Sequence, residues 1–313
     1  MADDDMRPRP APAPSGSGHG GRPQDAHRGM GALWAGTFRV VGRRWRDLAV
    51  AATLGAASWL VAFVSAYVGV NELFDGQFWA KLDALFSGEI ETTAEIDAWL
   101  ASFEFTFTPQ AAGLLLVALV ASFVSILQSA ASAQIARQEL AGIDAGASTA
   151  VSIALGRLPA PLLVNVVLTV VQAAVFLIGI GLAAVADPLG AVWDLLTFLV
   201  SIVVLPLLAI FWVMVYVEPG LPSLRRWNRL LGRNKLATWG RVMLFDVVRM
   251  VFAGIVFLVA VVSPLSFAYS LAIVTVLVWP ATVGIVTVTH VIMYEDLASG
   301  MGSGDDSARS GQG

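Results

Sequence analysis

Residues 191–217 read AVWDLLTFLVSIVVLPLLAIFWVMVYV, and residues 218–242, which follow directly, read EPGLPSLRRWNRLLGRNKLATWGRV. The first stretch is apolar over nearly its whole length. A helix rises about 1.5 Å per residue and the hydrocarbon core of a bilayer is about 30 Å thick, so the stretch is long enough to cross a membrane. The second stretch is strongly basic. Together they predict a membrane-spanning helix that ends in a cytoplasmic connection.

Five other segments have the same apolar character. Lipid offers no hydrogen-bond partner to a backbone amide, so every span must be helical. The predicted spans are residues 48–70, 111–136, 162–185, 191–217, 243–262 and 265–293. The chain is 57% hydrophobic and only 13% charged, whereas soluble domains average about 25% charged residues. We therefore predict an all-α polytopic membrane protein, with one six-helix transmembrane domain over residues 30–298.

The two tails differ from this domain. Residues 1–29 and 299–313 are rich in Pro, Gly, Ser, Asp and Arg and contain few large apolar side chains. Such segments cannot bury enough apolar surface to offset the entropy of ordering them. We predict that both tails are disordered.

The basic residues alternate between the two sides of the predicted spans. The loop of residues 71–110 is acidic, with Lys81 as its one basic residue. The segment before the first span contains Arg7, Arg9, Arg22, Arg28, Arg39, Arg43, Arg44 and Arg46, and the next connection on the same side contains Arg137 and Arg157. Lys and Arg in short loops stay in the cytoplasm. We predict a multi-pass protein of the cell membrane with both termini cytoplasmic.

Composition and motifs argue against an enzyme. The chain has no cysteine, which excludes disulfides, thiolate metal sites and cysteine nucleophiles. It has no H-E-x-x-H or G-x-S-x-G motif, and His290 is its one histidine outside the predicted tails. We expect no catalytic residues, no metal and no cofactor. The preference for Arg over Lys, with abundant Ala, Val and Gly, is typical of GC-rich prokaryotic genomes.

A basic amphipathic helix is predicted between the fourth and fifth spans. Leu224, Trp227, Leu230 and Leu231 alternate at helical spacing with the arginines. Basic residues near a membrane surface attract anionic headgroups, and the predicted headgroup contacts are Arg225, Arg226, Arg229 and Arg233. We expect membrane lipids as partners, together with a partner protein or a second copy of the chain, and no nucleic acid.

Three short matches suggest an internal repeat. Residues 41–43 (VGR), 155–157 (LGR) and 231–233 (LGR) precede the first, third and fifth spans. Each follows a stretch that could form a short cytoplasmic helix, for which Gly would suit the C-terminal cap. Three copies of short helix, span, outer turn and span would give a parallel three-hairpin repeat about the membrane normal.

Small residues recur at steps of three and four in the first two spans. In the first span they are Gly55, Ser58, Ala62, Ser65 and Gly69. Small side chains let helix backbones approach in lipid, so we expect these stripes to pack the first helix against others in the bundle. The alternative is that the serines of the stripes line a polar pathway. In the acidic loop, aromatic residues around Phe78 and Trp79 predict a short amphipathic helix. It would lie either in the membrane interface or as a lid on the bundle.

Five polar residues stand out inside the predicted spans: Asn165, Gln172, Asp246, Arg249 and His290. Polar side chains in a membrane are costly and often functional. In the structural interpretation Asp246 and Arg249, at i and i+3, form a neutralised ion pair while the amides join helices. In the functional interpretation the five form a candidate intramembrane polar site between the third, fifth and sixth spans. Pro206 and Pro280 could kink the helices in either case.

The order of these features resembles a known family. After 155–157 come Pro206 within the fourth span, Glu218 at its end, and the basic helix. The order is similar to that of the six-helix membrane domain found beside some bacterial glycerophosphodiester phosphodiesterases, and of its uncharacterised stand-alone relatives. The resemblance covers roughly residues 30–297. Trp227 departs from the serine that the family usually has near that place. Residues 1–313 contain no phosphodiesterase domain, so we expect the resemblance to imply architecture and not activity.

These observations favour a non-enzymatic membrane protein, an accessory that binds or organises lipid or a partner protein. A secondary transporter of a small or amphiphilic molecule is the alternative. Several acids near the middle of the membrane on neighbouring helices would favour coupled transport, but Asp246 is the one candidate and we expect it to be paired.

Overall fold

The computed structural model describes residues 29–87, 92–102, 104, 106–262 and 267–310, and the side chains of 86, 93, 100, 187, 233 and 300–310 lie outside that description. All regular structure in the described residues is helical. Six helices are long and apolar enough to cross a membrane. The prediction of an all-α, six-span membrane protein is therefore confirmed.

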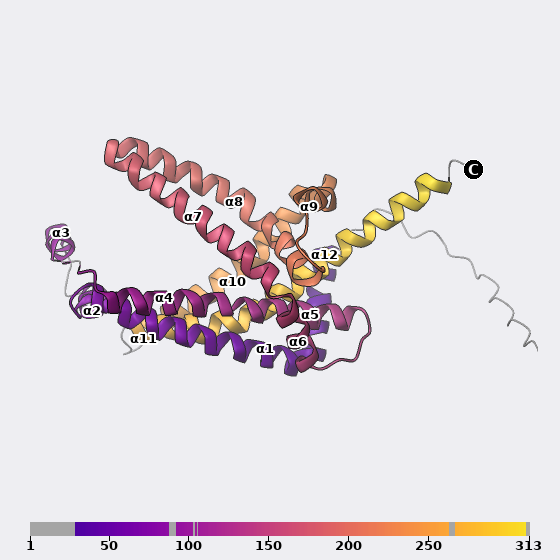
Figure 1. The fold of residues 1–313 in the computed structure, drawn as a ribbon, viewed down its shortest axis with the longest axis horizontal. Helices are drawn as coiled ribbons and strands as arrows, with labels where there is room; N and C mark the ends of the chain where they lie inside the picture. The colour runs from indigo at the N-terminus through magenta and orange to yellow at the C-terminus, as the bar shows by residue number, and fades with distance from the viewer. Residues whose placement is uncertain (1–28, 88–91, 103, 105, 263–266, 311–313) are drawn as a thin grey trace, which may run out of the picture.

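The six spans follow the predicted order (Figure 1). They are α1 (Met30–Leu73), α4 (Pro109–Val124) with α5 (Ile126–Leu140), α7 (Pro159–Val185), α8 (Asp187–Val217), α10 (Lys235–Val262), and α11 (Phe267–Ala272) with η2 (Ile273–Val278) and α12 (Trp279–Ser310). Shorter helices connect them: α2 (Phe78–Phe86), α3 (Thr93–Ala101), α6 (Ala147–Arg157), α9 (Leu224–Leu231) and η1 (Gly232–Asn234).

Two of the spans are interrupted. The second changes from α4 to α5 at Ser125. The sixth contains the π-helical turn η2 directly before Pro280. Proline lacks the amide hydrogen that a regular helix needs, and its ring crowds the preceding turn. The irregular turn of the sixth span therefore lies where the sequence predicts a kink.

The first helix bends where its basic N-terminal part meets its apolar span. Arg44 leaves helical geometry, with φ −112° and ψ 20°. Its guanidinium pairs with Asp47 at 3.1 Å and Asp144 at 3.5 Å, and donates to the carbonyl oxygen of Ala145. These contacts tie the bend to the loop between α5 and α6. They also lie at the end of the molecule that holds Arg43, Arg137, Arg157 and Arg226, which we call the basic end.

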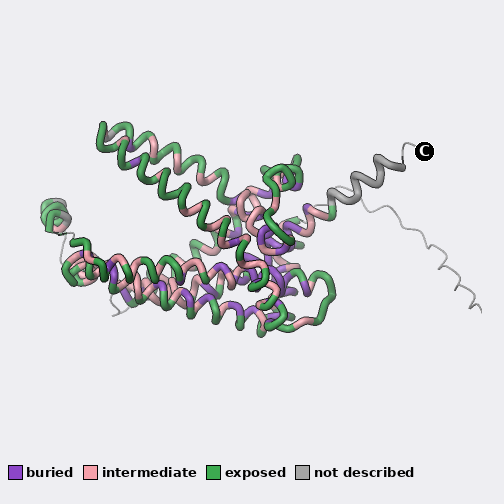
Figure 2. The backbone as a smooth tube through the Cα atoms, viewed as in Figure 1, coloured by how far each residue is buried: buried purple, intermediate pink, exposed green. Residues whose placement is uncertain are grey.

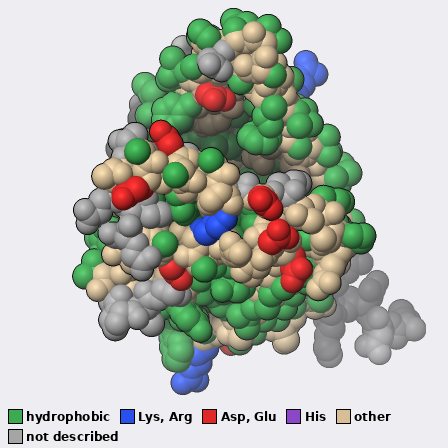
Figure 3. Space-filling view, turned by 90° about the vertical axis from the view of Figure 1, so that its left-hand side faces the viewer, with side chains coloured by type: hydrophobic (Ala, Val, Ile, Leu, Met, Phe, Trp, Pro, Cys, Tyr) green, Lys and Arg blue, Asp and Glu red, His purple; other side chains and the backbone are tan. Residues whose placement is uncertain are grey.

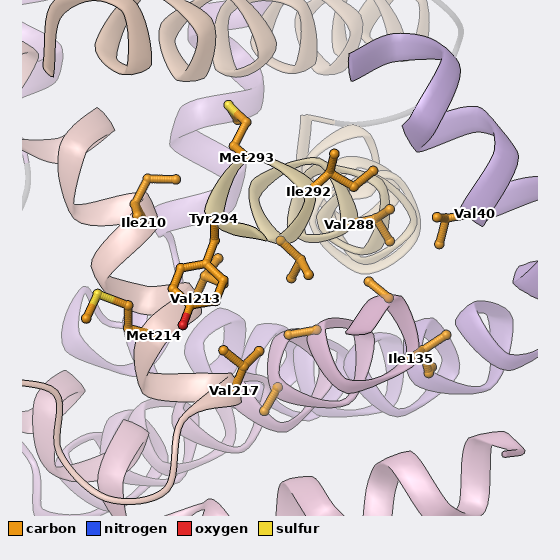
Figure 4. Packing of buried hydrophobic residues seen from close by; sticks show 14 of the residues in the cluster. Val40, Ile135, Ile210, Val213, Met214, Val217, Val288, Ile292, Met293 and Tyr294 are labelled. Carbon is orange, nitrogen blue, oxygen red and sulfur yellow. The ribbon is translucent and has the colours of Figure 1, made fainter. Parts of the chain in front are cut away.

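The buried core is concentrated at the basic end, where the buried segments of Figure 2 meet. Figure 4 shows α12 in its centre, with Val288, Ile292 and Tyr294 between the neighbouring helices. Residues of α8, α5 and α1 surround them, namely Ile210, Val213, Met214, Val217, Ile135 and Val40. The largest cluster of buried hydrophobic residues therefore lies at one end of the bundle.

The first two spans pack along the predicted seam of small residues. Gly55, Ser58, Ala62 and Gly69 are buried. The hydroxyl of Ser58 donates to the carbonyl oxygen of Ala121 on α4 at 2.5 Å. A Cβ at Gly69 would lie 3.1 Å from the Cβ of Leu114. The close approach of α1 and α4 therefore depends on residues without large side chains.

The hairpin of α7 and α8 extends away from the other spans (Figure 1). Ala186 turns the chain, and Pro188 begins the next helix at a position where no amide donor is needed. Trp193 donates its indole hydrogen to the carbonyl oxygen of Val175 at 3.0 Å. The helix α7 packs on α8 and touches α6, whereas α8 joins the hairpin to α5, α10 and α12. The hairpin therefore contacts the rest of the bundle chiefly through α8.

The acidic loop packs on the opposite end of the bundle. Trp79 of α2 stacks on Tyr67 with ring centroids 4.7 Å apart and donates to the Tyr67 carbonyl oxygen at 2.8 Å. Asp83 accepts a hydrogen bond from the amide of Phe267 at 2.8 Å, which caps the start of α11. These contacts favour the lid over a helix that floats in the interface.

Short helices precede the first, third and fifth spans, as the repeat requires, but the repeat itself stays a prediction. Gly232 caps α9 with a positive φ of 44°, whereas Gly42 and Gly156 lie inside helices, so the cap interpretation is wrong for these two.

The backbone of α12 continues to Ser310, into a predicted disordered tail. Residues 1–28 and 311–313 lie outside the described residues, and disorder of both tails stays a prediction.

Candidate functional site

The five polar residues singled out inside the spans line one cavity. It lies between α5, α7, α8, α10 and α12 and has a volume of about 440 Å³. Asn165 and Gln172 belong to α7, Asp246 and Arg249 to α10, and His290 to α12. The structure thus brings together residues that are far apart in the sequence, from the three spans that the functional interpretation named.

Three of these residues lie at a similar depth in their spans. Asn165 and Asp246 each follow the start of their apolar stretches, 162–185 and 243–262, by three residues, and His290 precedes the end of 265–293 by three. At 1.5 Å per residue, each is about 5 Å inside the boundary of its stretch. The cavity therefore lies at the edge of the hydrocarbon region, on the side of the basic end.

Asp246 and Arg249 form the predicted ion pair. Nη2 of Arg249 lies 3.5 Å from Oδ1 of Asp246, and both side chains are largely buried. The guanidinium carbon lies 4.4 Å from the centre of the Trp279 ring, a cation–π contact that partly replaces lost hydration. The pair and the ring hold Arg249 against the wall of the cavity.

Two side chains that line this cavity each hold a buried nitrogen without a hydrogen-bond partner among the described residues. The nitrogens are Nε of Arg249 and Nε2 of His290, and both are fully buried. His290 as a whole is only 9% exposed. A buried polar group without a partner costs about 1–3 kcal/mol, so a ligand that accepts hydrogen bonds here would recover part of that cost.

The cavity has further polar and aromatic groups that were not assigned to the candidate site from the sequence. Ser129 of α5 hydrogen-bonds Tyr216 of α8, and both line the cavity with Thr287. Trp279 completes the site as the platform under Arg249. Ser, Tyr, Thr and Trp also occur in purely structural helix contacts, so only their spacing relative to Asp246 and His290 in three dimensions reveals them.

An apolar groove continues from this cavity along the hairpin. It has a volume of about 560 Å³ and is lined by α7 and α8 alone. The cavity and the groove share Leu168, Gln172, Leu205 and Leu208, and the groove reaches Trp193 and Asp194 near the far end of α8. Figure 3 shows the molecule hollowed beneath the far end of the hairpin. The site as a whole is a polar cavity joined to a long apolar groove.

Arginines fix the end of α8 beside the cavity. Arg137 donates to the carbonyl oxygen of Val217 at 2.6 Å, and Arg157 donates to the same oxygen. Gln134 donates to the carbonyl oxygen of Tyr216 at 2.6 Å. Positive charge at a helix C-terminus is stabilising. Burial, and then the charge of Arg137, lower the pKa of Arg157 from its ordinary value.

The basic helix α9 packs on this end with one face. Ser223 caps it by accepting from the amide of Arg226 at 3.1 Å. Leu230 and Leu231 are buried, and Trp227 donates to the carbonyl oxygen of Leu207 at 3.2 Å. Leu224, predicted on the same face, is exposed instead, because it begins the helix beyond the edge of the bundle.

The arginines of α9 lie on its other face. Arg225, Arg226 and Arg229 are exposed, while the side chain of Arg233 lies outside the described residues. Arg226 pairs with Glu218 at 3.1 Å, and Glu218 also accepts from the hydroxyl of Tyr294 at 2.7 Å. Arg225 and Arg229 are therefore the predicted headgroup residues best placed to reach a membrane surface.

Within the described part of the chain, no group of three His, Asp or Glu side chains could hold a metal ion. Comparison of the sequence and the structure with family models, with curated proteins and with solved structures gave no match. The resemblance to the six-helix membrane domain therefore stays a prediction, and the function is argued from the site itself.

Proposed function

We propose that this chain is a non-enzymatic accessory protein of the cell membrane that binds a lipid. The observation that carries the proposal is the continuity of the polar cavity with the apolar groove, through Leu168, Gln172, Leu205 and Leu208. A lipid has the same division between a polar headgroup and apolar chains. The headgroup would occupy the cavity and an acyl chain the groove.

The surroundings support a lipid as the occupant. The cavity lies about 5 Å inside the hydrocarbon edge, a short distance from the level of lipid headgroups. The groove runs from there along α7 and α8 toward the opposite face. A lipid of the adjacent leaflet would enter sideways and keep its usual direction.

The proposed orientation places the basic end in the cytoplasm. Arg43, Arg44, Arg137, Arg157 and Arg226 belong to connected contacts at that end. Lys81 is found with α2, at the opposite end of the chain's first span. The positive-inside rule then supports cytoplasmic termini, and the bound lipid would come from the cytoplasmic leaflet.

The chemistry of the cavity supports binding over catalysis. Acid–base or nucleophilic catalysis needs a reactive group with a second group in hydrogen-bond reach. Nε2 of His290 has no such partner in the described residues, and Asp246 is engaged by Arg249. These groups are placed to recognise a polar molecule.

The test is lipid retention by the purified full-length protein. Native mass spectrometry after gentle solubilisation should detect at least one bound lipid. Thr197→Trp, which fills the apolar groove, should abolish retention, whereas Val203→Trp, on the exposed side of the same helix, should not. Equal retention by wild type and both variants would refute the proposed binding mode.

Transport of an amphiphilic molecule is the second candidate. The observation that favours it is the length of the site, which leads from the cavity near the basic end to Asp194 near the far end of α8. Reconstituted vesicles distinguish the two functions. A transporter would move a fluorescent lipid between leaflets, and Thr197→Trp would stop that movement, whereas an accessory protein would bind the lipid without moving it.

A further inference from the structure

We infer that the polar cavity recognises a zwitterionic phosphoethanolamine headgroup, with its ammonium at Asp246 and its phosphate at Arg249 and His290. The inference rests on the proposed lipid-binding function and adds the chemical class of the headgroup. Its starting point is that a cation, an anion and an unpartnered imidazole line the same small cavity.

The charge balance of the cavity selects against a headgroup with net charge. Arg249 and Asp246 cancel when the imidazole of His290 is counted as neutral. Within a medium of low dielectric constant, an uncompensated charge is expensive. A headgroup with one positive and one negative charge leaves the total at zero, whereas a phosphatidylglycerol headgroup adds one unbalanced negative charge.

The unpartnered nitrogens identify the side that faces the phosphate. Guanidinium Nε always donates, and an imidazole nitrogen donates when it carries a proton. Nε of Arg249 and Nε2 of His290 are both buried without partners. Phosphate oxygens are strong acceptors and pair well with a guanidinium. A phosphate that the Arg249 and His290 side chains turn toward on binding would therefore satisfy two buried groups that have no partner among the described residues.

The opposite side of the pair suits an ammonium group. Asp246 is an acceptor with only one oxygen engaged by Arg249 in the ion pair at 3.5 Å. The side-chain oxygens of Asn165 and Gln172 are further acceptors in the same cavity. A primary ammonium has three donors, whereas the trimethylated ammonium of phosphatidylcholine has none. The cavity should therefore discriminate between these two zwitterions.

The experiment is a competition between lipids with identical acyl chains. Full-length protein is equilibrated with mixed micelles of phosphatidylethanolamine, phosphatidylglycerol and phosphatidylcholine in equal amounts, and retained lipid is quantified. We expect phosphatidylethanolamine to be enriched about tenfold over each of the others, the size of one charge-assisted hydrogen bond. Equal retention of the three lipids would overturn the headgroup inference.

Variants test the assignment of each charge. Asp246→Asn should remove the preference and favour phosphatidylglycerol, because it leaves Arg249 as a net positive charge. Asp194→Asn removes a carboxylate from the apolar groove instead and should leave the preference unchanged. Asp246→Asn with Arg249→Gln restores neutrality and guards against misfolding of the single variant. It should show no preference, and unchanged selectivity in this double variant would refute the assignment.

Two further arms separate this inference from the proposed function. A water-soluble phosphoethanolamine diester without acyl chains should compete for the cavity at least a hundredfold less well than the lipid. Equal competition would show that the headgroup is recognised as a free metabolite, and it would refute lipid binding. Thr197→Trp should reduce retention of all three lipids alike. If the wild type binds lipid but does not discriminate between the three headgroups, only the headgroup inference is contradicted. If Thr197→Trp leaves retention unchanged, the assignment of the acyl chain to the groove is contradicted.

Discussion

Replacing Gly55 with alanine should disrupt the junction of three spans. A Cβ at Gly55 would lie 1.7 Å from Oε1 and 2.4 Å from Cδ of Gln128. Gln128 is buried, and its Nε2 donates to the carbonyl oxygen of Pro280 at 2.5 Å. The added methyl group must therefore either separate α1 from α5 or displace an amide that joins α5 to the sixth span.

The size of the effect follows from opposing contributions to the free energy of unfolding. Overpacking costs about 1–3 kcal/mol, and the lost hydrogen bond costs between about 0.6 kcal/mol, the membrane-protein average, and about 3 kcal/mol. Alanine is the better helix former by about 1 kcal/mol. We expect a net loss of about 2 kcal/mol. Gly113→Ala is the matched control, since no atom lies within 4 Å of its added Cβ.

The assay is equilibrium unfolding in mixed micelles, applied as a double-mutant cycle with Gln128→Ala. Truncating Gln128 removes the atoms that the added methyl group would meet, so Gly55→Ala should cost nothing further in that background. Because only the gain of about 1 kcal/mol in helix propensity then remains, the coupling energy between the two positions should be about 3 kcal/mol. Additive losses, or equal effects of Gly55→Ala and Gly113→Ala, would refute the packing described for this junction.

Three further predictions concern charge. In a chain without native cysteine, a cysteine at Asp97 should react with an impermeant thiol reagent on intact cells and one at Asn228 should not; the reverse would invert the topology. Asp246→Asn should lower the free energy of unfolding by about 1–3 kcal/mol because it leaves Arg249 unpaired, and the additional change Arg249→Gln should recover most of this loss. Additive losses in thermal melts in detergent would contradict the ion pair. Replacing Arg225 and Arg229 with glutamine should reduce binding of anionic lipid about thirtyfold at low salt, at about 1 kcal/mol per charge; an unchanged amount of co-purified anionic lipid would exclude α9 as a headgroup contact.

The spans and the polar cluster could be predicted because both follow from the energetics of lipid. An apolar stretch longer than the hydrocarbon core has one stable conformation, so the predicted stretches coincide with helices. A charged or amide side chain in such a stretch needs a partner, and this requirement drew attention to Asp246, Arg249 and His290. Their convergence on one cavity could not be read from the sequence, because it depends on the rotation of three separate helices about their axes.

The buried glutamines show where this reasoning was incomplete. Gln128 and Gln134 lie in the last turns of the second predicted span, residues 111–136, but they were not included among the polar residues of the candidate site. In the structure both are buried, and each donates to a backbone carbonyl oxygen of another span. A glutamine amide at the end of a span can hydrogen-bond either to water or to a neighbouring helix. The residue type alone does not show which of these partners it has.

The projecting hairpin has a related physical cause. In water an apolar face must be buried, so its direction on a helix predicts where the neighbours lie. In lipid the same face is equally stable against acyl chains or against protein, and it does not specify a partner. The packing surface of α1 was predictable because small residues mark it, whereas most of the surface of α7 and α8 is apolar and does not indicate which helices of the bundle they face. The contacts of Trp193 and the arginine-capped end of α8 then determine where the hairpin lies. The groove can form there because apolar surface of α7 and α8 that faces lipid costs little free energy.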